Sequence, residues 1–239
     1  CRDIMQPSVK KRFWTDVSVV ANSGGFDVLL DEHVLRTPSK SRMIVPTKAL
    51  AQAVATEWAA QVEAVDPTTM PMTRRVNTAI DKVVLQQADV AAMLSEYGGS
   101  DLCCYRAEFP TELAARQAAA WDPIIDWVAQ KFEARLKITT GIMHLSQDPK
   151  HLASFAGSVH ALGPFQLTGF HDLVTHSGSL LIAFAAILEF EGPNDLWDRA
   201  QVDEIWQAEQ WGADEDAEVV EAKKRQEFLD AFRFFGLVS

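Results

Sequence analysis

Two histidines and an aspartate, His171, Asp172 and His176, are the residues of this chain that could bind a metal ion. Imidazole nitrogens and carboxylate oxygens together suit zinc or iron. Histidine ligands on one helical face are normally four residues apart, as in H-E-x-x-H, whereas these two are five apart. The wider spacing turns the second ring well away from the first, so we favour solvated or hydrogen-bonded helix histidines and expect no metal site. A small hydrolase or metal-dependent enzyme that uses these three residues is the alternative.

Two further groups could carry nucleophilic or redox chemistry. Ser177-Gly178-Ser179 partly matches a nucleophile elbow, but the G-x-S-x-G frame and a preceding strand are both missing. A cluster of small residues that lets two helices approach closely is the better interpretation. Cys103 and Cys104 are adjacent and lack C-x-x-C spacing, which favours buried small side chains over a redox centre or zinc ligands. With no phosphate-binding glycine loop either, the sequence predicts no catalytic residue and no cofactor.

The strongest charge feature is a segment without bases near the end of the chain. Residues 200–222 contain no lysine or arginine and eight acids: Asp203, Glu204, Glu209, Asp214, Glu215, Asp216, Glu218 and Glu221. Acids that open the helix expected from Asp214 are favoured by the helix dipole, which explains about half of the charge. Asp203 and Glu204 belong to the preceding helix and are not explained in this way. A surface that steers and holds a basic protein partner is the functional interpretation.

Tryptophans raise a similar choice between core and binding surface. Trp58 lies among apolar helical neighbours and is predicted to pack in the core. Trp197, Trp206 and Trp211 lie instead in the acidic, mostly polar stretch. Exposed tryptophan is costly for solubility and is enriched at binding hot spots. Burial of these three rings is narrowly favoured, and the open alternative is that some of them form a partner site.

The N-terminal part of the chain predicts strands. Val17 and Val19 on one side and the apolar residues 28–30 on the other flank Asn22-Ser23-Gly24-Gly25, whose glycines tolerate the positive φ of a tight hairpin. Short β segments are expected at residues 33–35 and 43–46, where prolines fit strand ends or edges. The pattern indicates a small antiparallel sheet.

From Thr47 onward the apolar period becomes helical. Thr47 is predicted to cap a helix that ends at Asp66-Pro67, and residues 70–73 are expected to form an irregular connector. Asp122-Pro123 is expected to start the helix that carries the apolar stripe 121–136. The other predicted helices are residues 77–94, 149–161, 165–189, 195–210 and 214–235. Gly98-Gly99 marks the predicted boundary between a β-rich N-terminal domain, residues 8–98, and a helical C-terminal domain, residues 99–239, so the fold class is α+β.

Composition narrows the functional classes. The chain has 239 residues, 48% of them apolar and 23% charged, and a net charge of −11. Such an acidic chain makes a poor binder of nucleic acid or anionic membranes. Three cysteines do not form a disulfide framework, and the longest apolar run, 180–190, is about half of the ~20 residues that span a bilayer. With no secretory signal or mitochondrial presequence in view, we expect a soluble protein of the bacterial cytoplasm.

Several segments, taken together and in order, resemble one known family. They are residues 11–14, 25–31, 36–38, 57–58, 70–73, 77–81, 101–107, 116–123 and 203–212. These segments resemble the assembly chaperones that bind the alpha subunit of the catalytic F(1) sector of ATP synthase, found in mitochondria and alphaproteobacteria. The resemblance covers nearly the full chain.

The resemblance implies a binding protein rather than an enzyme. Its expected role is to hold the free alpha subunit soluble, as a monomer, by covering the surface that the beta subunit later occupies. Beta then displaces the chaperone, which hydrolyses no ATP, and in eukaryotic relatives this happens in the mitochondrial matrix. A general chaperone that recognises exposed apolar surface, whatever its source, is a third hypothesis.

Few site residues transfer from the family to this chain. The family's functionally important acid aligns with Glu204, or with its neighbour Asp203. The expected partner-binding residues are therefore Glu204 and Asp203, together with Trp206, Glu209 and Trp211 of the same segment. Trp58 matches a family tryptophan whose expected role is packing.

Overall fold

The computed structural model describes residues 11–212 and 214–239. Contacts divide the chain into an N-terminal unit up to Lys82 and a C-terminal unit from Val83. The division falls before the expected boundary at Gly98-Gly99, because the helix after Val83 packs on later helices of the C-terminal unit. The expected domain start at residue 8 lies outside the described residues. A small antiparallel sheet followed by a mostly helical remainder confirms the α+β class.

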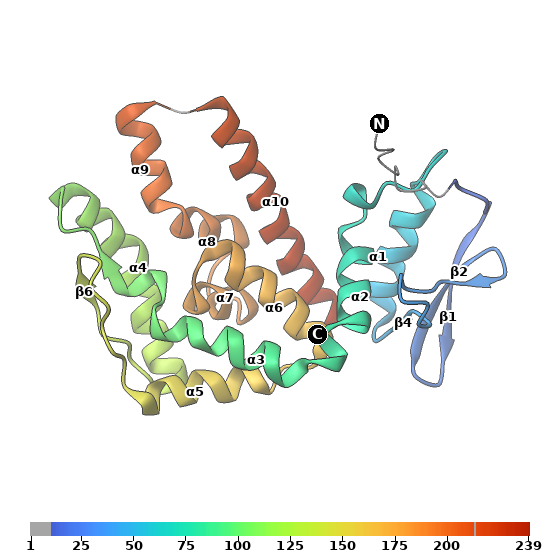
Figure 1. Ribbon diagram of the computed structural model, residues 1–239, viewed down its shortest axis with the longest axis horizontal. Coiled ribbons are helices and arrows are strands. Elements are labelled where there is room, and N and C mark those ends of the chain that lie inside the picture. Colours follow the sequence, from blue (N-terminus) through green and yellow to red (C-terminus); the bar gives the residue numbers. More distant parts are fainter. Residues whose placement is uncertain (1–10, 213) are drawn as a thin grey trace, which may run out of the picture. The chain divides into compact units, whose positions relative to one another are not determined.

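The N-terminal unit combines a small sheet with two helices (Figure 1). In chain order its elements are β1 (Val17–Asn22), β2 (Gly25–Leu30), β3 (His33–Val34), β4 (Ile44–Val45), α1 (Lys48–Ala59), the 3-10 turn η1 (Pro67–Thr69) and α2 (Pro71–Asp81). The predicted hairpin is confirmed: β1 pairs antiparallel with β2, and Asn22 opposite Gly25 closes it. Gly25 has φ +142°, and a Cβ there would collide with the backbone of β4, so the position requires glycine. β3 and β4 both pair with β2.

Helix α1 packs on β1 and β2 and begins as predicted. The side chain of Thr47 accepts a hydrogen bond from the Leu50 amide at 3.2 Å. The helix ends at Ala59, earlier than predicted, because Gln61 organises the following turn. Its side chain donates to the Glu57 carbonyl at 3.1 Å and accepts from the Asp66 amide at 2.7 Å.

The connector predicted at residues 70–73 is wrong, since α2 begins at Pro71. The carboxylate of Glu57, on α1, accepts from the Met72 amide at 2.7 Å and the Thr73 amide at 2.8 Å. These bonds satisfy N-terminal amides of α2 from another helix, so no local capping signal is needed. The next residue of α1, Trp58, packs edge-on against Trp14 at 5.3 Å between ring centroids.

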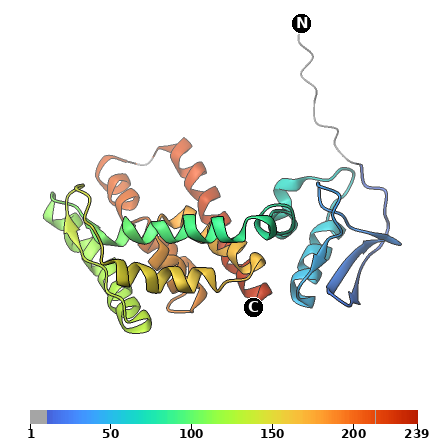
Figure 2. The ribbon, with the colours of Figure 1, turned by 60° about the horizontal axis from the view of Figure 1, so that its bottom comes forward.

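The C-terminal unit is built almost entirely of helices (Figure 1). Its elements are η2 (Val83–Leu85), α3 (Gln87–Ser95), η3 (Glu96–Gly99), η4 (Leu102–Cys104), β5 (Tyr105–Arg106), α4 (Thr111–Phe132), β6 (Thr139–Thr140), α5 (Pro149–His160), α6 (Pro164–Ser177), α7 (Leu180–Ile187), α8 (Pro193–Ala200), α9 (Val202–Trp211) and α10 (Glu215–Val238). Helices α3 and α5 lie side by side in both views (Figure 1, Figure 2). The apolar helix α7 is buried and contacts α4, α6 and α8, so it forms the centre of the core.

Four further helix predictions need correction. The predicted helix 77–94 divides into the end of α2, the 3-10 turn η2 and α3. Residues 165–189 form two helices, because Gly178 adopts φ +68° and Ser179 caps α7 by accepting from the Ile182 amide at 3.0 Å. No atom lies within 4 Å of a Cβ built on Gly178, so the Ser177-Gly178-Ser179 triplet serves this turn rather than a close helix approach. Residues 195–210 likewise divide into α8 and α9. Helix α4 starts at Thr111, and Pro123 lies inside it rather than at its first turn.

The adjacent cysteines are buried, as predicted. Burial raises the pKa of Cys104 to about 12 and holds that of Cys103 well above its ordinary value. Both follow Asp101, whose buried carboxylate accepts hydrogen bonds from the Cys103 amide at 2.9 Å, the Ser179 hydroxyl at 2.8 Å and the Leu181 amide at 3.1 Å. This carboxylate therefore joins η4 to the start of the central helix α7.

Candidate functional site

The histidine group shows a local contact rather than a convergent site. Nδ1 of His171 lies 3.1 Å from the carboxylate of Asp172, its neighbour on α6, and both side chains are partly exposed. Among the residues that the structure describes, no three His, Cys, Asp or Glu side chains converge so as to hold a metal ion.

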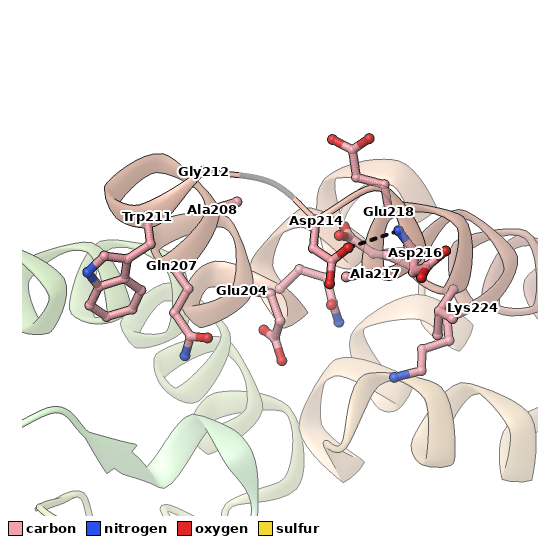
Figure 3. A pocket seen from close by; sticks show the side chains of 13 residues that line it. Glu204, Gln207, Ala208, Trp211, Gly212, Asp214, Asp216, Ala217, Glu218 and Lys224 are labelled. Atoms are coloured by element: carbon pink, nitrogen blue, oxygen red, sulfur yellow. Dashed lines mark hydrogen bonds between the residues drawn. The ribbon is translucent and has the colours of Figure 1, made fainter.

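A groove of about 610 Å³ lies between α9 and α10 (Figure 3). We call it the acidic groove, after the five acids that line it: Glu204, Asp214, Asp216, Glu218 and Glu221. Its apolar lining includes Trp211 at the end of α9 and Val220 on α10. Trp211 is 78% exposed and Val220 is 53% exposed, so an apolar surface is open to solvent among the acids.

Local sequence explains how the two walls are placed. Helix α9 ends at Gly212, which adopts φ +87°. Helix α10 starts at Asp214, whose side chain accepts from the Asp216 amide at 3.1 Å. Asp216 and Glu218 stand in the first turn of α10, where the helix dipole favours acids. These acids therefore have a structural reason to be in the groove.

Glu204 stands in the first turn of α9, where the helix dipole also favours an acid, and its side chain lines the groove. Figure 3 shows its carboxylate and the ammonium group of Lys224, on the facing helix, extending toward the same side of the groove. Partial desolvation raises the pKa of Glu204, and the charges of Asp203 and Glu221 raise it further, while Lys224 acts in the opposite direction. A second cation brought into the groove would stabilise this carboxylate.

The structure separates the two neighbouring acids. Asp203 accepts a hydrogen bond at 2.7 Å from Gln117 of α4, on the side of α9 away from the groove lining. Gln117 is buried and its carbonyl oxygen accepts from the Ala107 amide at 2.6 Å. Asp203 is thus engaged in holding α9 on α4, whereas Glu204 lines the groove.

Trp206 and Glu209 also face α4. The Arg116 guanidinium lies 4.8 Å from the centroid of the Trp206 ring and 2.7 Å from the Glu209 carboxylate. Of the five expected partner-binding residues, the groove therefore brings together Glu204 and Trp211, while the other three pack α9 against α4. Burial, narrowly favoured for all three late tryptophans, is confirmed for Trp197, which is 1% exposed and packs in the core, and is wrong for Trp211, whose ring is open to solvent.

Two groove residues were not predicted from the sequence. Lys224 supplies a positive charge just beyond the base-free segment, and Val220 supplies exposed apolar surface. Ala217, Val220, Glu221 and Lys224 stand at positions i, i+3, i+4 and i+7, which is the spacing of one helical face. This periodicity is the sequence signal that could have predicted these two residues as part of the same face as Glu221.

Comparison with known proteins finds relatives that match nearly the whole chain. The crystal structure of Atp12 from Paracoccus denitrificans is 45% identical, with 96% of this chain and 98% of that chain covered and a TM-score of 0.93. Residues 11–129 match the model of the ATP12 chaperone protein family. The chain belongs to the ATP12 chaperone family.

Other ATP12 relatives span bacteria and mitochondria. The mitochondrial protein atp12 of Schizosaccharomyces pombe is 23% identical over 90% of this chain and 78% of its own length. The structure of protein Atu1473 from Agrobacterium tumefaciens is 37% identical, covers 98% of this chain and 88% of its own, and gives a TM-score of 0.94. A mutant of the Paracoccus protein with lysine in place of an aspartate matches this ATP12 chain with a TM-score of 0.93, so the fold accommodates one such charge reversal.

The length and polarity of the helices in this ATP12 chain decide whether one of them could cross a membrane. In the described part of the chain, no helix has the length and apolar character needed to cross a membrane. The buried apolar helix α7, with eight residues, is a core helix of this unit.

Proposed function

We propose that this ATP12 family member is a molecular chaperone for assembly of the F(1) sector of ATP synthase. In this proposal it binds the free alpha subunit as a monomer and shields the surface that beta will occupy, until beta displaces it. It catalyses no reaction, and it acts in the bacterial cytoplasm, as its eukaryotic relatives do in the mitochondrial matrix. Family membership and the resemblance of segments along the whole chain support the proposal.

The acidic groove is the observation that carries the binding role. Its five acids and the exposed indole of Trp211 line the same groove, and Lys224 is the only base among the described residues that line it. Such a surface suits a protein segment that presents an apolar side chain flanked by lysine or arginine. Charge complementarity would steer that segment to the groove, and the indole would supply the apolar contact.

The enzyme alternative gains no geometric support. It depends on His171, Asp172 and His176 converging with other groups, whereas the ring of His171 contacts Asp172, its own sequence neighbour. We therefore develop only the chaperone proposal.

The test is capture of isolated F(1) subunits by the purified full chain. We expect selective retention of alpha over beta, and weaker retention as the salt concentration rises, because screening reduces the electrostatic share of the contact. Salt-independent retention of alpha would indicate that the contact is made by apolar surface rather than by charged groups. Equal retention of alpha, beta and unrelated unfolded proteins would indicate a general chaperone, and retention of neither subunit would contradict the proposal.

A further inference from the structure

Strand β1 lies at the edge of the N-terminal sheet, and its pairing register fixes which backbone groups are unused. In the described part of the chain β1 pairs with β2 alone. Asn22 opposite Gly25 closes a two-residue turn, and the Asp31 amide donates to the Asp16 carbonyl at 2.9 Å at the other end. Hydrogen-bonded pairs alternate along an antiparallel ladder, so the even-numbered residues of β1 are the ones that bond to β2.

The odd-numbered residues, Val17, Val19 and Ala21, therefore direct their amides and carbonyls away from β2. The neighbouring strand gives an independent check at one pair. Val28, opposite Val19, accepts from the Leu35 amide at 2.9 Å on the far side of β2. Among the described residues no backbone hydrogen bond is made by the outward groups of Val17, Val19 or Ala21.

This edge also lacks the usual protection against strand addition. Natural edge strands commonly carry lysine, proline or a bulge. The β1 sequence is VSVVAN, its pairing with β2 runs without a bulge, and Val20 is 49% exposed on the opposite face from Val19. An open edge of this kind is a template for another strand.

A groove of about 510 Å³ lies beside the edge, between β1 and α1. Val17 and Val19 form its strand side, and small residues of α1, Ala55 and Ala59, keep the helix side shallow. Lys48 is the only charged residue among the described residues that line it. The open backbone edge, the apolar wall and the single positive charge therefore occur together.

We propose that an extended segment of a client polypeptide adds to the outer edge of β1 and lies between β1 and α1. Its backbone pairs with Val17, Val19 and Ala21, and every second side chain, small and apolar, enters the groove. An acidic residue of the segment pairs with Lys48. Main-chain bonds give affinity in such strand addition, and the pockets for alternate side chains give selectivity.

The proposal specifies the ligand class and does not depend on which client supplies it. It is also separate from the acidic groove, which lies in the other unit and suits a basic ligand. The two surfaces select opposite charges, so a peptide for one is a control for the other.

Amide hydrogen exchange in the full chain tests the proposal directly. The probe is a capped heptapeptide, Asp-Thr-Val-Thr-Val-Thr-Asp, in which the valines and both aspartates lie on one face of the strand. We expect fast exchange at the Val17, Val19 and Ala21 amides in the free protein and at least tenfold slowing when the peptide is saturating. Ser18 and Val20, already bonded to β2, should change little. Peptide binding without slowing at the odd-numbered amides would overturn the proposal.

A modified peptide distinguishes backbone pairing with β1 from non-specific apolar binding. Methylation of alternate peptide nitrogens removes the donors on one edge while keeping every side chain, so binding should fall at least fivefold, as loss of two or three backbone bonds implies. Equal binding of the methylated and unmethylated peptides contradicts strand addition. Protection of the odd-numbered amides that rises with protein concentration, without peptide, would mean that a second copy of this chain occupies the edge and would also overturn the proposal.

Protein variants complete the test. Val19→Pro removes an outward donor at an edge position where proline is tolerated, and should weaken peptide binding about fivefold or more, whereas Val19→Thr keeps the amide and should bind within about twofold. Lys48→Glu should weaken the aspartate peptide but not a neutral analogue. Because Lys48 is the first residue of α1, glutamate there is favoured by the helix dipole, so lost stability would not explain lost binding. If both peptides bound equally well to Lys48→Glu and to the native chain, the proposed pairing of Lys48 with an acidic residue of the segment would be wrong.

Discussion

Gln117 donates a 2.7 Å hydrogen bond to Asp203, joining residues 86 positions apart and holding α9 on α4. Gln117 is itself buried, and its other amide atom accepts from the Ala107 backbone. Asp203 therefore ends a short polar chain that runs into the unit, while the next residue, Glu204, lines the acidic groove. We therefore expect these adjacent acids to have separable roles, Asp203 in stability and Glu204 in the proposed binding.

Asp203→Ala is expected to lower the free energy of unfolding by about 1–3 kcal/mol, because it leaves the buried Gln117 amide without its acceptor. Gln117→Ala should cost a similar amount. Since both changes break the same bond, the double variant should lose less than the sum of the two. Urea unfolding of the four proteins measures this. Strict additivity would show that the bond contributes nothing to stability.

Glu204→Lys should act on binding instead. We expect at least a tenfold loss of affinity for the alpha subunit in the proposed complex, with a melting temperature within a few degrees of the native one. The side chain is exposed, and a lysine in the first turn of α9 costs only about 0.3–1 kcal/mol through the helix dipole. Calorimetric titration and thermal unfolding provide the two readouts.

Glu215→Lys is the matched control for that variant. It makes the same change of net charge at an exposed residue that does not line the groove. It should weaken the start of α10 by about 0.3–1 kcal/mol through the helix dipole, yet bind alpha nearly normally. If both variants lost affinity equally, net charge rather than Glu204 would govern binding.

Local signals predicted the elements that depend on local chemistry. The hairpin at Gly24-Gly25 and the Thr47 cap need only their own neighbours, and both are confirmed. The start of α2 depends instead on the carboxylate of Glu57 from another helix, which the pattern around residues 70–73 does not contain. Helix α4 tolerates Pro123 in its interior, where the preferred position of proline had suggested a start.

The candidate site was predicted as a segment but not as a surface. Charge counting found the acidic residues, since their excess is a property of the sequence alone. It could not tell that Asp203 and Trp206 contact α4 while Glu204 and Trp211 line the acidic groove, because that depends on which side of α9 packs on Gln117 and Arg116. The sequence did not predict the open edge of β1 either, because that edge follows from the pairing of the strands rather than from composition.

Asp101→Ala should destabilise the C-terminal unit strongly. The Cys103 and Leu181 amides and the Ser179 hydroxyl would lose a buried acceptor together, at a cost of about 3–5 kcal/mol. The melting temperature should fall by roughly 10 °C. Exposed Asp126→Ala, which breaks a surface pair with Arg135, is the control and should cost less than about 1 kcal/mol. Equal losses in the two variants would show that Asp101 does not join η4 to α7.

Asp27→Asn should change the acid stability of the N-terminal unit. Asp27, on β2, is 3% exposed and accepts from Arg42 Nε at 2.9 Å and from Asn22 at 2.7 Å. The bonds from Arg42, above all, hold the pKa of Asp27 below its ordinary value, with Asn22 contributing, although burial acts the other way. A lowered folded-state pKa gives stability that is present above the unfolded value and lost as the pH falls through the folded one.

The native chain should therefore exceed Asp27→Asn in free energy of unfolding by about 1–2 kcal/mol at pH 7, the exposed position of Arg42 limiting the value. The difference should persist to about pH 5 and shrink below about pH 4, the region of an ordinary aspartate pKa. Urea unfolding at several pH values measures it, with Glu32→Gln, an exposed acid in the turn between β2 and β3, as the charge-matched control. A difference between the native chain and Asp27→Asn that stayed constant from pH 7 to pH 3 would show that the ionised carboxylate of Asp27 does not hold Arg42 against the sheet.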